Sequence, residues 1–183
     1  MRNGYEQDKA ANAPQPKYRC LVWACPEHYY TNFTYWTQHC WGVTCVNDME
    51  AMLSYQPITI GDKEQALADL VRCYEKMMMR SHTNGGYVNL LDECWKMCEK
   101  FHTNIAIMYD HVSCKNVGGL HGLFEDQARE RGIHLIWIPH DVMDPRTVSR
   151  REMREAFSQY MVTVLNEKPL DPTLLDYEDT LSW

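Results

Sequence analysis

The residues best suited to chemistry lie together between positions 109 and 119, where the sequence reads YDHVSCKNVGG. Within six residues this segment carries a carboxylate, an imidazole, a thiol and an amine, on Asp110, His111, Cys114 and Lys115. Gly118 and Gly119 then let backbone N–H groups approach a ligand, just before a predicted helix whose N-terminus favours an anion. The segment also follows a predicted parallel strand, and ligands of open α/β sheets bind at the carboxyl ends of the strands. We therefore predict a ligand site here.

Cys114 admits three interpretations on its own residues. As a nucleophile it needs a base, and His111 stands three residues away. As a metal or iron–sulfur ligand it needs thiolate partners, which no local CxxC run supplies. As a small apolar residue it packs at the end of a strand. The residue pattern leaves all three open.

A second polar segment, PHDVMDPR at 139–146, follows the next predicted strand. Asp141 and Arg146 suit the recognition of an anion or an amide. The same residues also suit a turn begun at Asp144, with a cap for the following helix. Both interpretations can hold together.

Cys40, Cys45 and Cys73 look like packing residues, and Cys94 and Cys98 continue an apolar helical stripe into the core. Cys20 and Cys25 flank the first predicted strand on opposite faces of the pleat, so we do not expect them to bind a metal together.

These segments need strands and helices to position them, and the hydrophobic pattern alternates between the two. Short apolar runs rich in β-formers predict strands at 17–24, 43–46, 104–109 and 133–138. Apolar residues at helical spacing predict helices at 32–41, 48–54, 63–79, 87–101, 120–131 and 149–165. Alternation of this kind predicts an α/β fold with Rossmann-like parallel sheets flanked by helices, arranged as two small lobes. A GxGxxG fingerprint is missing after every strand, which argues against a nicotinamide enzyme.

The overall composition excludes several classes of function. The 183 residues carry a net charge of −7, which argues against a nucleic-acid partner. Apolar runs are too short to span a membrane, and the N-terminus lacks the apolar stretch of a signal peptide. We therefore expect a cytoplasmic protein without a membrane partner. Its eight cysteines form no CxxC pair and are expected to be reduced.

The order of these segments resembles the 2-hydroxyacyl-CoA dehydratase family, which also includes the ATP-dependent benzoyl-CoA reductases. The strand, HVSCK, glycine and helix sequence at 104–131 looks like the C-terminal domain of that family. The resemblance continues through IHLIWIPHDVMDPRTVSRREMREAFSQYMVTVL, and YRCLVWACPEHYYTNFTYWTQHCWGVTCVND looks like the middle domain. Together these stretches cover most of residues 17–166.

The resemblance implies a lyase subunit that eliminates water from a 2-hydroxyacyl-CoA by radical chemistry. It also implies a [4Fe–4S] cluster held by three cysteines, of which Cys114 matches one. The other two come from an N-terminal domain that this chain is expected to lack. The implied partners are a sister dehydratase subunit, an ATP-dependent iron–sulfur activator protein and the acyl-CoA substrate. A flavin is compatible with the family, although nothing in the sequence indicates one.

On this basis we predict roles for seven residues. Cys114 is the predicted metal and cofactor ligand, His111 and Lys115 are catalytic, and the substrate-binding residues are Gly118, Gly119, Asp141 and Arg146. The predicted divisions are a linker-like segment at 1–16, a middle-domain-like lobe at 17–86, a C-terminal domain at 87–166 and a loose acidic tail at 167–183. The alternatives are a benzoyl-CoA reductase-like subunit and a non-catalytic, truncated scaffold of the same fold.

Overall fold

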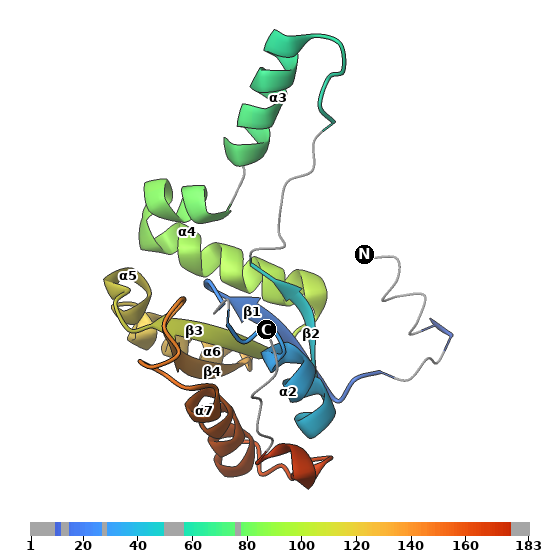
Figure 1. Ribbon diagram of the computed structural model, residues 1–183, viewed down its shortest axis with the longest axis vertical. Coiled ribbons are helices and arrows are strands. Elements are labelled where there is room, and N and C mark those ends of the chain that lie inside the picture. Colours follow the sequence, from blue (N-terminus) through green and yellow to red (C-terminus); the bar gives the residue numbers. More distant parts are fainter. Residues whose placement is uncertain (1–9, 12–14, 27–28, 50–56, 76–77, 177–183) are drawn as a thin grey trace.

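A computed structural model describes residues 10–11, 15–26, 29–49, 57–75 and 78–176 (Figure 1). Its strands are β1 (Tyr18–Trp23), β2 (Val43–Asp48), β3 (Ile105–His111) and β4 (His134–His140). Its helices are α2 (Phe33–Trp41), α3 (Lys63–Glu75), α4 (Met78–Phe101), α5 (Lys115–Gly118), α6 (His121–Arg131) and α7 (Arg150–Thr163), followed by the short 3₁₀ helix η1 (Pro172–Leu174). The predicted helix at 48–54 overlaps the end of β2 at Asp48, and its residues 50–54 lie outside the described part.

The four strands form one sheet in the order β2-β1-β3-β4, and every neighbouring pair is parallel. This confirms the predicted α/β class with a Rossmann-like parallel sheet. The predicted two lobes, however, share that sheet, because β1 from the first lobe pairs with β3 from the second. Residue 86, the predicted boundary, falls inside α4. The pairing of strands that are distant in sequence depends on tertiary packing, so local sequence patterns do not predict it.

Helices cover both faces of the sheet because the strand side chains alternate between two apolar layers. On one face, Val22 and Ile107 pack with residues of α2 and α7, such as Trp36 and Phe157. On the other face, the adjacent strand residues pack with α4 and α6, through side chains that include Leu91, Cys94, Cys98 and Phe124. Figure 1 shows these two helical layers on either side of the strands. Cys94 and Cys98 are buried, as predicted.

Several helix ends follow directly from the sequence. Gly42 and Gly132 end α2 and α6 with positive φ angles of 70° and 66°, the left-handed conformation that glycine adopts without strain. Ser149 and Glu152 form a reciprocal capping box at the start of α7. These signals explain why the predicted ends of the three helices are close to the observed ones.

The long helical region before β3 differs from its prediction in detail. Residues 81–85, which fall between the predicted helices at 63–79 and 87–101, are helical, and only Gly86, with φ 72°, interrupts α4. The amphipathic helix expected at 63–79 forms as α3, but its apolar residues Leu67, Leu70, Val71 and Tyr74 are all exposed. Figure 1 shows α3 projecting beyond the layered body of the protein.

The start of the predicted loose tail is anchored to the body of the protein. The Leu170 N–H donates to the Cys40 carbonyl at 2.7 Å, and the Trp36 indole donates to the Leu174 carbonyl at 2.9 Å. Tyr18 donates to the Glu167 carboxylate at 2.6 Å, which raises the pKa of Tyr18 to about 12. Residues 167–175 are therefore held in place, because their polar groups complete the ends of β1 and α2.

Candidate functional site

A pocket of about 230 Å³ lies at the carboxyl ends of β1, β3 and β4. The chain leaves β1 toward β2 on one side and later returns to β3 on the other, so the strand order reverses between β1 and β3. Such a reversal opens a crevice that open α/β proteins use to bind ligands. The lining residues are Trp23, Ala24, Cys25, Met49, Leu90, Tyr109, His111, Cys114, Asn116, Val117, His140 and Val142.

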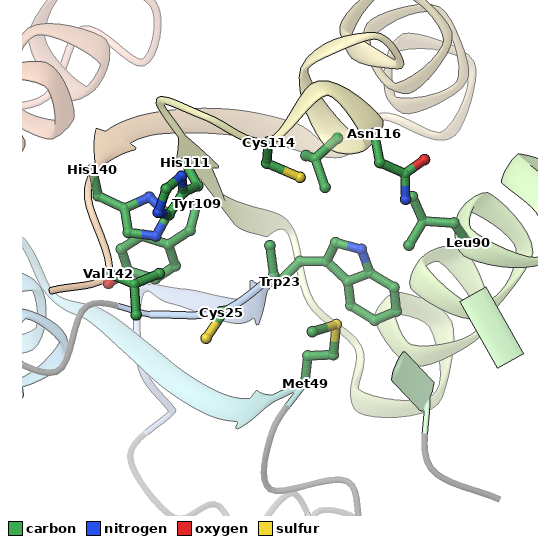
Figure 2. Close-up of a pocket in the computed structure, with 12 residues that line it drawn as sticks. Trp23, Cys25, Met49, Leu90, Tyr109, His111, Cys114, Asn116, His140 and Val142 are labelled. Carbon is green, nitrogen blue, oxygen red and sulfur yellow. The ribbon is translucent and has the colours of Figure 1, made fainter. Parts of the chain in front are cut away.

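The walls of the pocket are largely apolar. Trp23 and Tyr109, at or near the ends of β1 and β3, are almost completely buried. Met49, Leu90 and Val142 add further apolar surface from the segment after β2, from α4 and from the segment after β4. Figure 2 shows the Trp23 indole near the centre of this group. A small apolar group therefore fits the pocket better than a highly charged one.

The end of β1 brings a thiol into the pocket through an unusual turn. Ala24 has φ 68°, a left-handed conformation that costs a non-glycine residue roughly 1–2 kcal/mol. The turn directs the chain away from the sheet and places Cys25 on the pocket lining. In Figure 2 the Cys25 sulfur points away from Cys114.

The end of β3 holds two of the predicted site residues, His111 and Cys114, on the same pocket. The Cys114 N–H donates to the His111 carbonyl at 2.8 Å, which closes a tight turn. The Ser113 N–H donates to His111 Nδ1 at 3.0 Å, so the neutral imidazole carries its proton on Nε2. Cys114 is half-buried, and its sulfur points toward the space above Trp23 (Figure 2).

This tautomer bears on the interpretation of Cys114 as a nucleophile. A general base must accept the thiol proton through an unprotonated nitrogen. His111 Nδ1 already accepts from the backbone, and Nε2 carries the proton. The arrangement therefore does not support a Cys114–His111 catalytic pair.

The end of β4 contributes His140, which pairs in register with His111. The His140 side chain is buried, and its ring lies 5.1 Å from the Tyr109 ring and 5.4 Å from the His111 ring, measured between centroids. Burial lowers the pKa of His140, and the neighbouring His111 lowers it further. His140 is therefore a neutral imidazole at the pocket at pH 7.

The other predicted site residues do not line this pocket. Asp141 accepts from the backbone N–H groups of Met143 and Asp144, and Arg146 forms an ion pair with Asp144 at 2.7 Å. These bonds produce the turn that was the alternative interpretation of the segment. Lys115 begins the short helix α5 and is exposed.

Gly118 and Gly119 lie at the end of α5, outside the pocket lining. A side chain at Gly119 would approach the Lys115 carbonyl to 3.0 Å, so this glycine allows close backbone packing. The roles predicted for Lys115, Gly118, Gly119, Asp141 and Arg146 remain predictions.

Sequence reasoning omitted Cys25, Asn116 and His140 from the predicted site. Cys25 and His140 each follow an apolar strand closely, which is the signal that identified Cys114. Asn116 stands two residues after Cys114, within the segment already singled out. A rule that marks every polar residue in the segments that follow the predicted strands would have found all three.

The resemblance implies a [4Fe–4S] cluster held by three thiolates, which can be compared with the donors present. The pocket offers two thiols, on Cys25 and Cys114, whose sulfur atoms point in different directions (Figure 2). Within the described ranges, no three His, Cys, Asp or Glu side chains are grouped closely enough to hold a metal ion. The described residues therefore do not fit a complete cluster, although Cys114 offers one accessible sulfur.

The comparisons with known proteins bear on the family to which the chain belongs. Within the described residues, no helix has both the length and the apolar character needed to cross a lipid bilayer. No curated protein matches the chain significantly. A family model described as 2-hydroxyglutaryl-CoA dehydratase, D-component, matches residues 2–161. This match spans both halves of the sheet and all three strands that border the pocket, and the chain therefore belongs to the 2-hydroxyglutaryl-CoA dehydratase D-component family.

Proposed function

We propose that this chain is a component of an iron–sulfur 2-hydroxyacyl-CoA dehydratase and that its pocket receives the acyl group of the thioester. The observation that carries the proposal is the position of Cys114, whose accessible sulfur faces an apolar pocket at the point where the strand order reverses. Family membership supports the reaction class, which is the loss of water from a 2-hydroxyacyl-CoA. That this loss proceeds by radical elimination is part of the proposal.

The residues of this chain would contribute binding and desolvation. Trp23, Met49 and Leu90 exclude water from a bound acyl group, while Cys114 supplies one thiolate to an iron–sulfur site. The remaining ligands of that site would lie outside the described residues. A sister subunit and an ATP-dependent iron–sulfur activator are the proposed partners, and the cytoplasm is the proposed location.

Anaerobic reconstitution with iron and sulfide tests the metal role of Cys114. The full chain is compared with Cys114→Ala, and Cys73→Ala serves as control because Cys73 lies on α3, away from the pocket. Any iron taken up by the full chain and by the control should be lost from Cys114→Ala, as measured by iron and sulfide content and by visible absorbance. Iron retained by Cys114→Ala would contradict the proposed ligand. A chain that takes up no iron would favour either a fragment whose remaining cluster ligands lie elsewhere or a non-catalytic scaffold.

Protection of Cys114 from iodoacetamide tests the pocket as an acyl-CoA site. The modification rate of Cys114 is followed by mass spectrometry with coenzyme A, a 2-hydroxyacyl-CoA or benzoyl-CoA present. We expect 2-hydroxyacyl-CoA to slow modification most, because its acyl group fills the space beside the sulfur. Stronger protection by benzoyl-CoA would favour a benzoyl-CoA reductase-like subunit, and equal rates with all three would exclude the pocket as the acyl site.

A further inference from the structure

Two cysteines that the proposed function does not use face each other across neighbouring strands. In the parallel ladder between β1 and β2, Cys20 pairs directly with Cys45, and both residues are free thiols. Neighbouring strands lie about 4.7–4.9 Å apart, within the range of about 4.4–6.8 Å between Cα atoms that a disulfide spans. The backbone therefore holds this pair at a spacing that suits a disulfide.

The side chains of the pair point to the same side of the sheet. Cys20 belongs to the apolar layer that the sheet shares with α2 and α7, and Cys45 packs against that layer. A hydrogen bond between the two thiols, together with burial, raises the pKa of Cys20. The same hydrogen bond lowers the pKa of Cys45, while burial acts in the opposite direction. Cys45 is therefore the member of the pair that loses its proton first.

The two thiols also differ in their access to solvent. Cys20 is fully buried, whereas Cys45 is half-buried on β2, which is an edge strand of the sheet. A small oxidant from solvent therefore reaches Cys45 before Cys20. The register shifts directly after this pair, because Val46 has no partner on β1. Since the ladder is already interrupted there, β2 can adjust locally while the two sulfur atoms come together.

We propose that Cys20 and Cys45 are a dithiol that hydrogen peroxide converts reversibly into a disulfide between β1 and β2. The Cys45 thiolate attacks one oxygen of the peroxide and becomes a sulfenic acid, and the released hydroxide takes up the proton that Cys45 lost. The Cys20 sulfur then attacks the Cys45 sulfur, and the displaced hydroxide leaves as water with the Cys20 proton. In total the two thiols lose two electrons and two protons, and the peroxide is reduced to two molecules of water.

A second pair of thiols is expected to behave differently. Cys94 and Cys98 also interact, but they stand four residues apart on α4 and are almost completely buried. Oxidation of a thiol depends on its exposure as well as on its thiolate character. We therefore expect Cys94 and Cys98 to stay reduced under conditions that oxidise Cys20 and Cys45.

Peroxide treatment of the reduced full chain tests the proposal. The remaining thiols are alkylated with iodoacetamide in denaturant, and the chain is digested with chymotrypsin in the absence of reductant. Cleavage after Trp23 and Trp41 places Cys20 and Cys45 on separate peptides. We expect mass spectrometry to show these two peptides joined by a disulfide, which dithiothreitol separates. The mass of the intact chain should fall by two hydrogen atoms.

Variants assign the order of the two steps. In Cys20→Ala the sulfenic acid on Cys45 has no second thiol to attack it, so dimedone should label Cys45. In Cys45→Ala neither the disulfide nor a dimedone label on Cys20 should form, because Cys20 is buried. Cys40→Ala is the matched control and should keep the disulfide, because Cys40 is buried in the same layer but its thiol donates to the Asp171 carbonyl at 3.6 Å. Near-UV circular dichroism shows whether each variant folds.

The wild-type chain alone decides whether the pair forms. The proposal would be wrong if Cys20 and Cys45 both stayed reduced at a peroxide concentration that oxidises Cys73, which is half-buried on α3. A disulfide from Cys45 to a cysteine other than Cys20 would also contradict it. Dimedone labelling of Cys20 in Cys45→Ala would instead reject the order of attack. None of these results depends on the acyl-CoA site, because neither thiol lines the pocket.

Discussion

At the scale of single residues, His140 links the pocket to the pH dependence of stability. Burial, followed by the nearby His111, lowers the pKa of His140 from 6.5, while the backbone groups of Cys25 and Asp110 act in the opposite direction. The unfolded chain therefore takes up a proton near pH 6.5, whereas the folded protein takes it up only at lower pH. The contribution of neutral His140 to the free energy of unfolding is fully present above pH 6.5 and is lost as the pH falls through the pKa of His140 in the folded protein.

Thermal unfolding at about pH 7.5 and pH 5.5 tests this linkage. The melting temperature of the wild-type protein should fall on acidification. The melting temperature of His140→Phe should fall less, because phenylalanine takes up no proton. His134→Phe should behave as the wild type does. If His140→Phe and the wild type lost the same amount, proton uptake by His140 would have no part in acid unfolding.

Individual site residues were predictable where a strand end brings them to the sheet edge. Cys114 and His111 follow a continuous apolar strand, and both line the pocket. Asp141 and Arg146 also follow a strand, but their polar groups are used by the local turn. Sequence distinguishes these two outcomes poorly, because a turn and a ligand site favour the same residue types.

At the scale of elements, α3 shows that helical periodicity and burial are separate properties. Its apolar stripe predicted a helix correctly, since a 3.6-residue period favours helix formation. The stripe remains exposed because α3 extends away from the sheet (Figure 1). In contrast, the stripe of α7 includes Met153 and Phe157, which are fully buried against the sheet.

Truncating one apolar side chain in α3 and one in α7 measures how much each helix face contributes to the free energy of unfolding. Phe157→Ala should lower the free energy of unfolding by about 3–5 kcal/mol, because it removes a buried aromatic side chain and leaves a cavity. Leu70→Ala should change it by no more than about 0.5 kcal/mol, because Leu70 is 41% exposed. Urea unfolding of the full chain gives both values. A large loss from Leu70→Ala would show that α3 packs against another part of the protein.

The segment after α7 was expected to be loose, and its contacts lead to a different expectation. A chain that ends at Asn166 loses the backbone bond from Leu170 to Cys40 and the carbonyl that accepts from Trp36. We expect a loss of about 1–3 kcal/mol in unfolding free energy, because groups buried by the tail lose their partners. A chain that ends at Asp176 keeps these contacts and is the reference. Equal stability of the two chains would show that the tail contributes nothing to the fold.

At the scale of the whole molecule, the pocket depends on strand pairing that no local pattern specifies. The sequence predicted the α/β class because strands and helices alternate, and parallel strands require such crossovers. It did not predict that β1 pairs with β3, which places Cys25 and Cys114 on one pocket. The two-lobe prediction divided the chain at residue 86, whereas α4 runs across that position and packs on the shared sheet.

The single sheet predicts that the two halves of the chain depend on each other. Besides the ladder between β1 and β3, the Arg19 side chain donates to the Phe101 carbonyl at 3.0 Å, and the Arg19 N–H donates to the Asn104 side chain at 2.9 Å. Residues 1–86 and 87–183 produced separately should each lack fixed tertiary structure, because each exposes an edge of a central strand and half of both apolar layers. Mixing them should restore near-UV circular dichroism and a one-to-one complex on gel filtration. If either half alone unfolded cooperatively, the original division into two lobes would be correct despite the shared sheet.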